Sequence, residues 1–77
     1  MFFNLPDGTR FTAKATKKGQ YLYGVAAELL IPTSDGHNVS HWTLASQHLT
    51  RDAAQRAGVT YRKSQHHLND LRLIEAA

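Results

Sequence analysis

The sequence predicts one α+β domain, in which an N-terminal β-hairpin or short meander packs on a C-terminal unit of three helices. Three observations support this fold class. Apolar and polar residues alternate between turn formers in the first part of the chain, whereas later segments have helical spacing and each follows a serine or threonine. A chain of 77 residues also has room for only one hydrophobic core.

The first two elements are expected to be strands. Residues 2–5 and 10–15 are separated by a Pro-Asp-Gly-Thr sequence, in which proline presets φ for a turn and Gly8 accepts a positive φ. In the second run apolar residues alternate with polar ones, as in a strand with one face in water. The pattern predicts a β-hairpin, followed by a second turn at residues 16–20.

The third element, residues 21–31, fits two interpretations. Helical spacing is present at Leu22, Val25, Ala26, Leu29 and Leu30. Alternation is present as well, and a third strand would complete a meander. The Ala-Ala-Glu-Leu-Leu sequence has high helix propensity, so we favour a short helix while the strand interpretation stays open.

Three capped helices are expected after a loop at residues 32–38. Ser40 is positioned to cap a helix that runs to about His48. Thr50 is positioned to cap a second helix at residues 51–57, and Gly58 to close it. Thr60 is positioned to cap a third helix at residues 61–74.

The glycine between the last two helices gives residues 50–71 the outline of a helix–turn–helix. Gly58 would accept the positive φ of the turn, and Val59 would anchor the turn in the core. Small side chains where the helices cross would come from Ala53, Ala54 and Ala57. Residues 40–74 are therefore expected to form a helix–turn–helix unit, packed against residues 1–31.

Residues 53–70 resemble, without a gap, the helix–turn–helix of lac-repressor-type regulators. The longer segment 49–74 resembles winged-helix regulators, with a capped short helix, a Gly-Val-Thr turn and a long helix that ends in spaced leucines. The resemblance covers about the last third of the chain and implies a transcriptional regulator or accessory DNA-binding factor. Ser64 and His67 depart from the family pattern, which has apolar residues at these positions.

Helical geometry and the resemblance together define candidate DNA contacts. Arginine, glutamine and asparagine side chains suit base edges, and Lys63 suits a phosphate. Tyr61 can also pack inward, so its role stays open, and Asp70 would repel phosphate. The predicted nucleic-acid-binding residues are Arg51, Thr60, Tyr61, Arg62, Lys63, Gln65, His66 and Asn69.

Double-stranded DNA is the leading expected partner, and the net charge of +3 agrees with an anionic one. The alternative is an inhibitor or adaptor of the kind found in phages and mobile elements, for example an anti-CRISPR-like protein, which binds a protein partner. Small size, the polar Ser64 and His67, and the acidic Asp70 favour this alternative. A homodimer is also expected, because so small a chain without cysteine has few other sources of stability.

No catalytic residues, metal site or cofactor are expected. Cysteine is absent, and the histidine pairs His37/His41 and His66/His67 do not place ligands on one helix face. Neither a nucleophile elbow nor a phosphate-binding glycine loop occurs. No charged leader precedes the first apolar residues and no apolar run is long enough to span a membrane, so a cytoplasmic location is expected.

Overall fold

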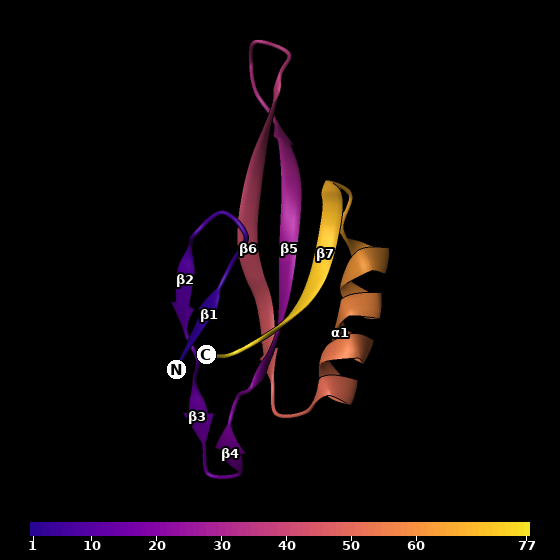
Figure 1. Ribbon diagram of the computed structural model, residues 1–77. Helices are drawn as coiled ribbons and strands as arrows, with labels where there is room; N and C mark the ends of the chain where they lie inside the picture. Colours follow the sequence, from indigo (N-terminus) through magenta and orange to yellow (C-terminus); the bar gives the residue numbers. More distant parts are fainter.

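The computed structural model describes residues 1–77 and has a single helix among seven strands. The largest sheet is antiparallel with the strand order β6-β5-β7, where β5 is Tyr23–Pro32, β6 is Asn38–His48 and β7 is Leu68–Glu75. The helix α1, Arg51–Ser64, connects β6 to β7 and packs against this sheet (Figure 1). The protein is therefore mostly β.

The predicted helix–turn–helix unit is wrong. Thr50 does cap α1, and its hydroxyl accepts the Ala53 N–H at 3.2 Å. The helix then continues through Gly58 to Ser64 instead of ending at Ala57. Gly58 is buried, has no positive φ, and lies against Leu71, whose Cδ2 is 3.2 Å from where a Cβ would be. This glycine therefore serves close packing of the helix on the sheet rather than a turn.

Both other C-terminal helices are also wrong. The segment predicted as a helix from Ser40 to about His48 lies in β6. Of the helix predicted at residues 61–74, residues 61–64 are the end of α1 and residues 68–74 belong to β7. These segments pair on the two sides of β5: Val25 is opposite Ser46 of β6 and Leu73 of β7. Pairing with a strand that is distant in the sequence overrides the local helical spacing.

The strand interpretation of residues 21–31 is correct, and the favoured helix is wrong, because this segment contains most of β5. β5 is the central strand, and Gly24, Val25, Ala26 and Ala27 are all buried. A strand that is covered on both faces is apolar at consecutive positions, so alternation alone does not distinguish it from a helix.

The N-terminal β-hairpin is confirmed. β1, Phe2–Asn4, pairs with β2, Arg10–Thr12, and Gly8 in the connecting turn has a φ of 90°. A second, shorter hairpin joins β3, Ala15–Thr16, to β4, Gly19–Gln20, with Gly19 at a φ of 135°. Both glycines have the left-handed conformation that other residues rarely adopt.

The central sheet is covered on both faces. On one face Leu5 packs with Ala26 and Trp42 in a buried cluster, beside the fully buried Phe3. On the other face α1 lies over Val25 and Leu71. Figure 1 shows β1 and β2 on one side of β5 and β6, and α1 on the opposite side.

The β5–β6 hairpin extends far beyond this two-sided core. The molecule measures 46 × 25 × 16 Å along its principal axes. In Figure 1 the end of the hairpin projects past β7 and α1. The loop at its end is closed by hydrogen bonds between Thr33 and His37 (2.8 Å from N–H of Thr33 to O of His37). We call residues 30–40, which form this projection, the arm.

Candidate protein-interaction surfaces

The predicted DNA-contacting residues do not share one helix face. Thr60, Tyr61, Arg62 and Lys63 lie in the last turns of α1, and Arg51 lies at its opposite end. The helix ends at Ser64 with Gln65 as its C-cap, and His66 lies in the turn that follows. Asn69 belongs to β7. The predicted recognition helix at residues 61–74 is therefore wrong.

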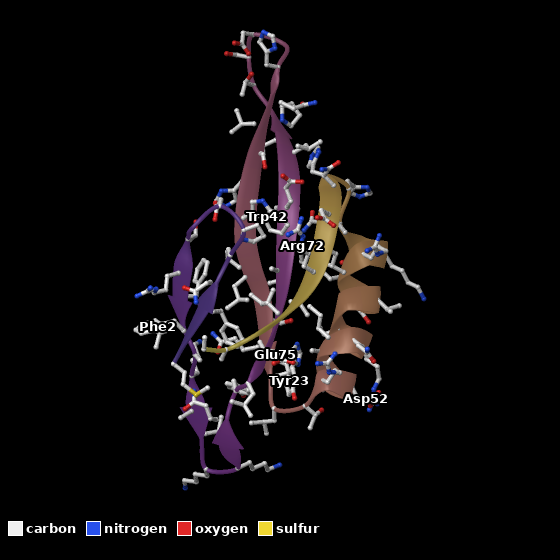
Figure 2. All side chains as sticks on the ribbon, viewed as in Figure 1. Phe2, Tyr23, Trp42, Asp52, Arg72 and Glu75 are labelled. Carbon is white, nitrogen blue, oxygen red and sulfur yellow. The ribbon has the colours of Figure 1, made fainter.

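Several of these side chains are engaged within the fold. Arg51 forms an ion pair with Glu75 at 2.6 Å and also lies over the Tyr23 ring, 5.7 Å from its centroid. The Tyr61 hydroxyl accepts a hydrogen bond from Gln65 Nε2 at 3.3 Å. Figure 2 shows Glu75 beside Tyr23, near the start of α1. The contacts of Arg51 connect the start of α1 to β7 and β5, whereas the Tyr61–Gln65 bond lies within the end of the helix. Arg62, Lys63 and His66 are exposed.

A polar bridge crosses the outer part of the sheet at Glu28. Its Oε2 accepts a hydrogen bond from Ser40 Oγ of β6, and its Oε1 accepts one from Asn69 Nδ2 of β7, both at 2.6 Å. These two hydrogen bonds lower the pKa of Glu28 below its usual range, and the bond from Ser40 has the larger effect. Beside this bridge Arg72 lies over Trp42, 5.2 Å from the ring centroid, as Figure 2 shows.

The Glu28 bridge predicts that part of the protein's stability depends on pH. Because folding lowers the pKa of Glu28, its stabilising contribution is complete above the pKa of an unfolded glutamate, about 4.3. That contribution is lost as the pH falls through the lower folded value. Ser40→Ala is expected to raise the pKa of Glu28, and Asn69→Ala to raise it less, in NMR titrations of the side-chain carboxyl carbons. Asp7 is the control, because Thr9 lowers its pKa and neither substitution touches Thr9. An unchanged pKa of Glu28 in both variants would contradict the bridge.

The arm exposes apolar side chains. Ile31 and Val39 are directly opposite each other on β5 and β6 and are 43% and 52% exposed. Neither is covered by α1 or by the N-terminal hairpins, since the arm lies beyond both (Figure 1). The chain has no lysine or arginine between Lys18 and Arg51, so the whole β5–β6 hairpin carries no permanent positive charge.

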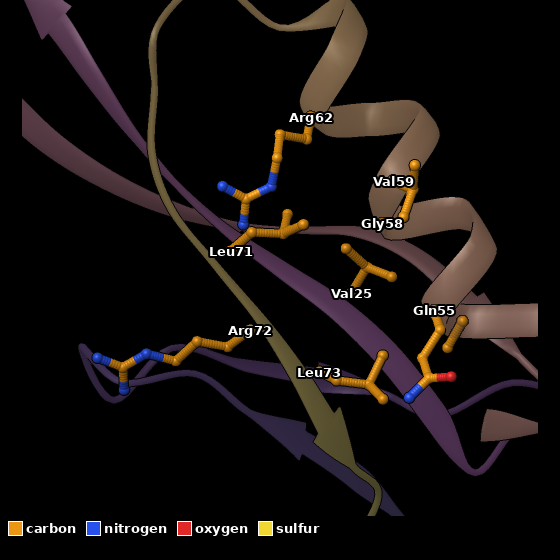
Figure 3. Close-up of a pocket in the computed structure, with 9 residues that line it drawn as sticks. Val25, Gln55, Gly58, Val59, Arg62, Leu71, Arg72 and Leu73 are labelled. Atoms are coloured by element: carbon orange, nitrogen blue, oxygen red, sulfur yellow. The ribbon is translucent and has the colours of Figure 1, made fainter. Parts of the chain in front are cut away.

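A groove between α1 and β7 is the second apolar surface. It has a volume of about 310 Å³ and is lined chiefly by Val25, Ala54, Gly58, Val59, Leu71 and Leu73. Val59 is 56% exposed, which is unusual for a valine in a helix that packs on a sheet. Figure 3 shows Leu71 and Leu73 on the helix side of β7 and Arg72 pointing away from the helix.

A second hollow, of about 560 Å³, lies between the N-terminal hairpins and β6. Phe11, Lys14 and Tyr21 line it together with residues of β6. Gln47 spans one side of it, accepting the Lys14 N–H at 2.9 Å and donating to the Thr12 carbonyl at 3.1 Å. Half of the residues that line the hollow are hydrophobic, and the bonds of Gln47 attach the N-terminal hairpins to the edge of β6.

No family model, curated protein or solved structure matches this chain. The structure has no cluster of three or more histidine or carboxylate side chains that could hold a metal ion. Its one helix is too short and too polar to cross a membrane.

Neither the arm nor the groove between α1 and β7 was predicted from the sequence. One signal for the arm was present: the alternation from Val25 through Ala27 and Leu29 continues to Ile31, directly before the turn-forming residues. The absence of lysine and arginine from residues 19–50 was a second signal. The groove had no such signal, because Val59 and Leu73 come together only through the pairing of β7 with β5.

Proposed function

We propose that this protein is a small adaptor or inhibitor that binds a protein partner by placing its arm against an apolar surface of that partner. The observation that carries the proposal is the exposed Ile31–Val39 pair at the end of a projecting hairpin. Contiguous apolar patches on the surface of soluble proteins commonly mark interaction sites. A hairpin also presents such side chains at low entropic cost, since its backbone is already ordered.

The distribution of charge favours a protein over DNA as the partner. A DNA-binding projection would need lysine or arginine to contact phosphates, and residues 19–50 contain neither. Among the arginines, Arg51, Arg56 and Arg72 are already paired with carboxylates of the same chain. The helix–turn–helix that supported the DNA hypothesis is not part of the fold.

The test compares capture of a partner with binding to DNA. The tagged chain is incubated with nuclease-treated lysate of the organism that encodes it, and the captured protein is purified and titrated. Ile31→Asp and Val39→Asp are each expected to weaken that complex about tenfold or more, since each would place a carboxylate in an apolar contact. Leu22→Asp is the matched control, an exposed leucine outside the arm.

Fluorescence anisotropy with a labelled DNA duplex at about 150 mM salt completes the test. We expect no binding tighter than the roughly 10⁻⁴ M typical of weak non-specific contacts. Two results would overturn the proposal. One is a nuclease-sensitive complex with submicromolar DNA affinity, and the other is a protein complex that is equally strong with both arm variants.

A further inference from the structure

The open edge of β7 points to a second surface, independent of the arm. β7 is the terminal strand of the sheet, and beyond it only Phe2 forms backbone hydrogen bonds, with Ala77 (2.8 and 2.9 Å). The Ala76 N–H points inward, to the Leu22 carbonyl. Because backbone groups alternate along an antiparallel strand, those of Leu71 and Leu73 point outward, away from β5. The edge is therefore unpaired along most of β7.

The side chains on this edge have a self-complementary order. Asp70 and Arg72 lie on one face of the sheet, and Leu71 and Leu73 lie on the face that α1 covers. The two charged groups form an exposed ion pair with each other at 3.0 Å. Asp70 Oδ1 also accepts the outward Leu71 N–H at 2.8 Å, so this carboxylate occupies the place of a missing strand.

From this order we propose that two copies of the chain associate through antiparallel pairing of their β7 strands, with Leu71 opposite Leu71 at the two-fold axis. The groove beside Val59 would then be closed by the second copy. In this register Asp70 is opposite Arg72 of the second copy, and Arg72 is opposite its Asp70. Each carboxylate releases the Leu71 amide, which then donates to the Leu71 carbonyl of the second copy.

Other symmetric registers fail on charge. Side chains that are directly opposite must lie on the same face of the joined sheet, so the axis must pass through a residue that is opposite itself. An axis at Asp70 places two carboxylates opposite each other, and an axis at Arg72 does the same with two guanidinium groups. Like charges in this position are unfavourable. An axis at Leu73 places the carboxylate of Glu75 opposite the apolar Leu71 of the second copy. Only the axis at Leu71 pairs opposite charges, and it does so twice.

Edge strands often carry charged residues of one sign, which prevent association because they repel the same residues of a second copy. β7 instead carries one charge of each sign, two residues apart, which its own two-fold image matches. The joined sheet would also place both α1 helices on the same face, so the exposed Val59 and Leu73 of each copy face the other copy. We expect a dissociation constant on the order of 10–100 µM, because the contact is smaller than a standard interface.

A charge-exchange experiment tests the register by sedimentation equilibrium of the full chain. Asp70→Arg and Arg72→Asp are each expected to raise the dimer dissociation constant about tenfold or more, since each creates two like-charge contacts. The double variant is expected to restore dimerisation, because the charges are again opposite. Lys17→Asp, which makes the same charge change as Arg72→Asp but in the turn between β3 and β4, is expected to leave the constant unchanged.

A wild-type measurement keeps the test independent of how well the variants fold. On dilution, NMR signals of Val59, Leu71 and Leu73 should shift, while those of Ile31 in the arm should not. A wild-type chain that stays monomeric at about 1 mM would overturn the proposal. So would single variants that dimerise like the wild type, or a double variant as weak as the singles. Because Ile31→Asp leaves β7 intact, it should impair partner binding and not dimerisation, which separates this proposal from the function of the arm.

Discussion

Replacing Phe3 with alanine is expected to lower the free energy of unfolding by about 3–5 kcal/mol. Phe3 is the largest fully buried side chain, at 0% exposure. Its ring lies against the sheet at Gly24, 3.0 Å from where a Cβ of that residue would be. Truncation would leave a cavity that the two surrounding hairpins cannot close, since both are fixed by backbone hydrogen bonds. Urea denaturation at neutral pH, followed by far-UV circular dichroism, measures the change.

Phe2→Ala is the matched control for this prediction. Phe2 is the neighbouring residue of the same type, but it is 42% exposed and its ring is covered mainly by the Arg10 guanidinium, 4.9 Å from the centroid. Its truncation is expected to cost about 1 kcal/mol, the size of an exposed cation–π contact with some lost apolar burial. Equal losses for the two variants would show that the N-terminal hairpin does not form the core with the sheet.

The N-terminal part of the fold was predictable from the sequence because local chemistry determines it. Gly8 and Gly19 have the positive φ values that their turns require, and no distant contact is needed to explain them. The cap at Thr50 was predictable for the same reason, since the residues that it joins are three apart. The loop between β5 and β6 also follows from its turn-forming residues.

The C-terminal part was not predictable because β6 and β7 depend on pairing with β5. Val25 is opposite Ser46 and Leu73, and neither partner is recognisable from the spacing within its own segment. The prediction that Gly58 closes a helix at residues 51–57 was wrong for a similar reason. Glycine after a short capped helix is typical of a helix end, but here Gly58 lies inside a continuous helix, with Leu71 of a distant strand packed close to it.

The same cause explains why the candidate surfaces were missed. Most of the predicted site residues were assigned to one recognition helix, but α1 ends at Ser64, so His66 and Asn69 lie beyond it. Asp70 was noted as unfavourable to DNA, and it is part of the charge pattern on the β7 edge. Ser64 and His67 occupy positions where the recognition helix of the family has apolar residues. In this structure both are exposed, Ser64 at the end of α1 and His67 after it.

Replacing Gly24 with valine is expected to destabilise the protein by about 3 kcal/mol, the upper part of the range for overpacked cores. A Cβ at this position would lie 2.9 Å from Leu44 Cδ1 and 3.0 and 3.1 Å from two atoms of the Phe3 ring. Leu44 can move its side-chain end, but the buried Phe3 ring has no free space. The branched valine adds two more methyl groups, so β5 or the N-terminal hairpin must shift. Thermal and urea denaturation should both report the loss.

Gly58→Ala separates the effect of packing from the effect of backbone conformation. Gly58 has a helical backbone, and alanine is favoured over glycine inside a helix by about 1 kcal/mol. The added Cβ would meet only Leu71 Cδ2 at 3.2 Å, the end of a flexible side chain that lines an open groove. We therefore expect Gly58→Ala to leave stability unchanged or to raise it by up to about 1 kcal/mol, measured at a concentration where the chain is monomeric. A glycine in a helix–turn–helix turn would have a positive φ, and alanine there would be destabilising. A clear loss of stability for Gly58→Ala would contradict the expectation that the Leu71 side chain can move aside. Tolerance at Gly58 with intolerance at Gly24 would agree with a helix and an N-terminal hairpin on opposite faces of the sheet.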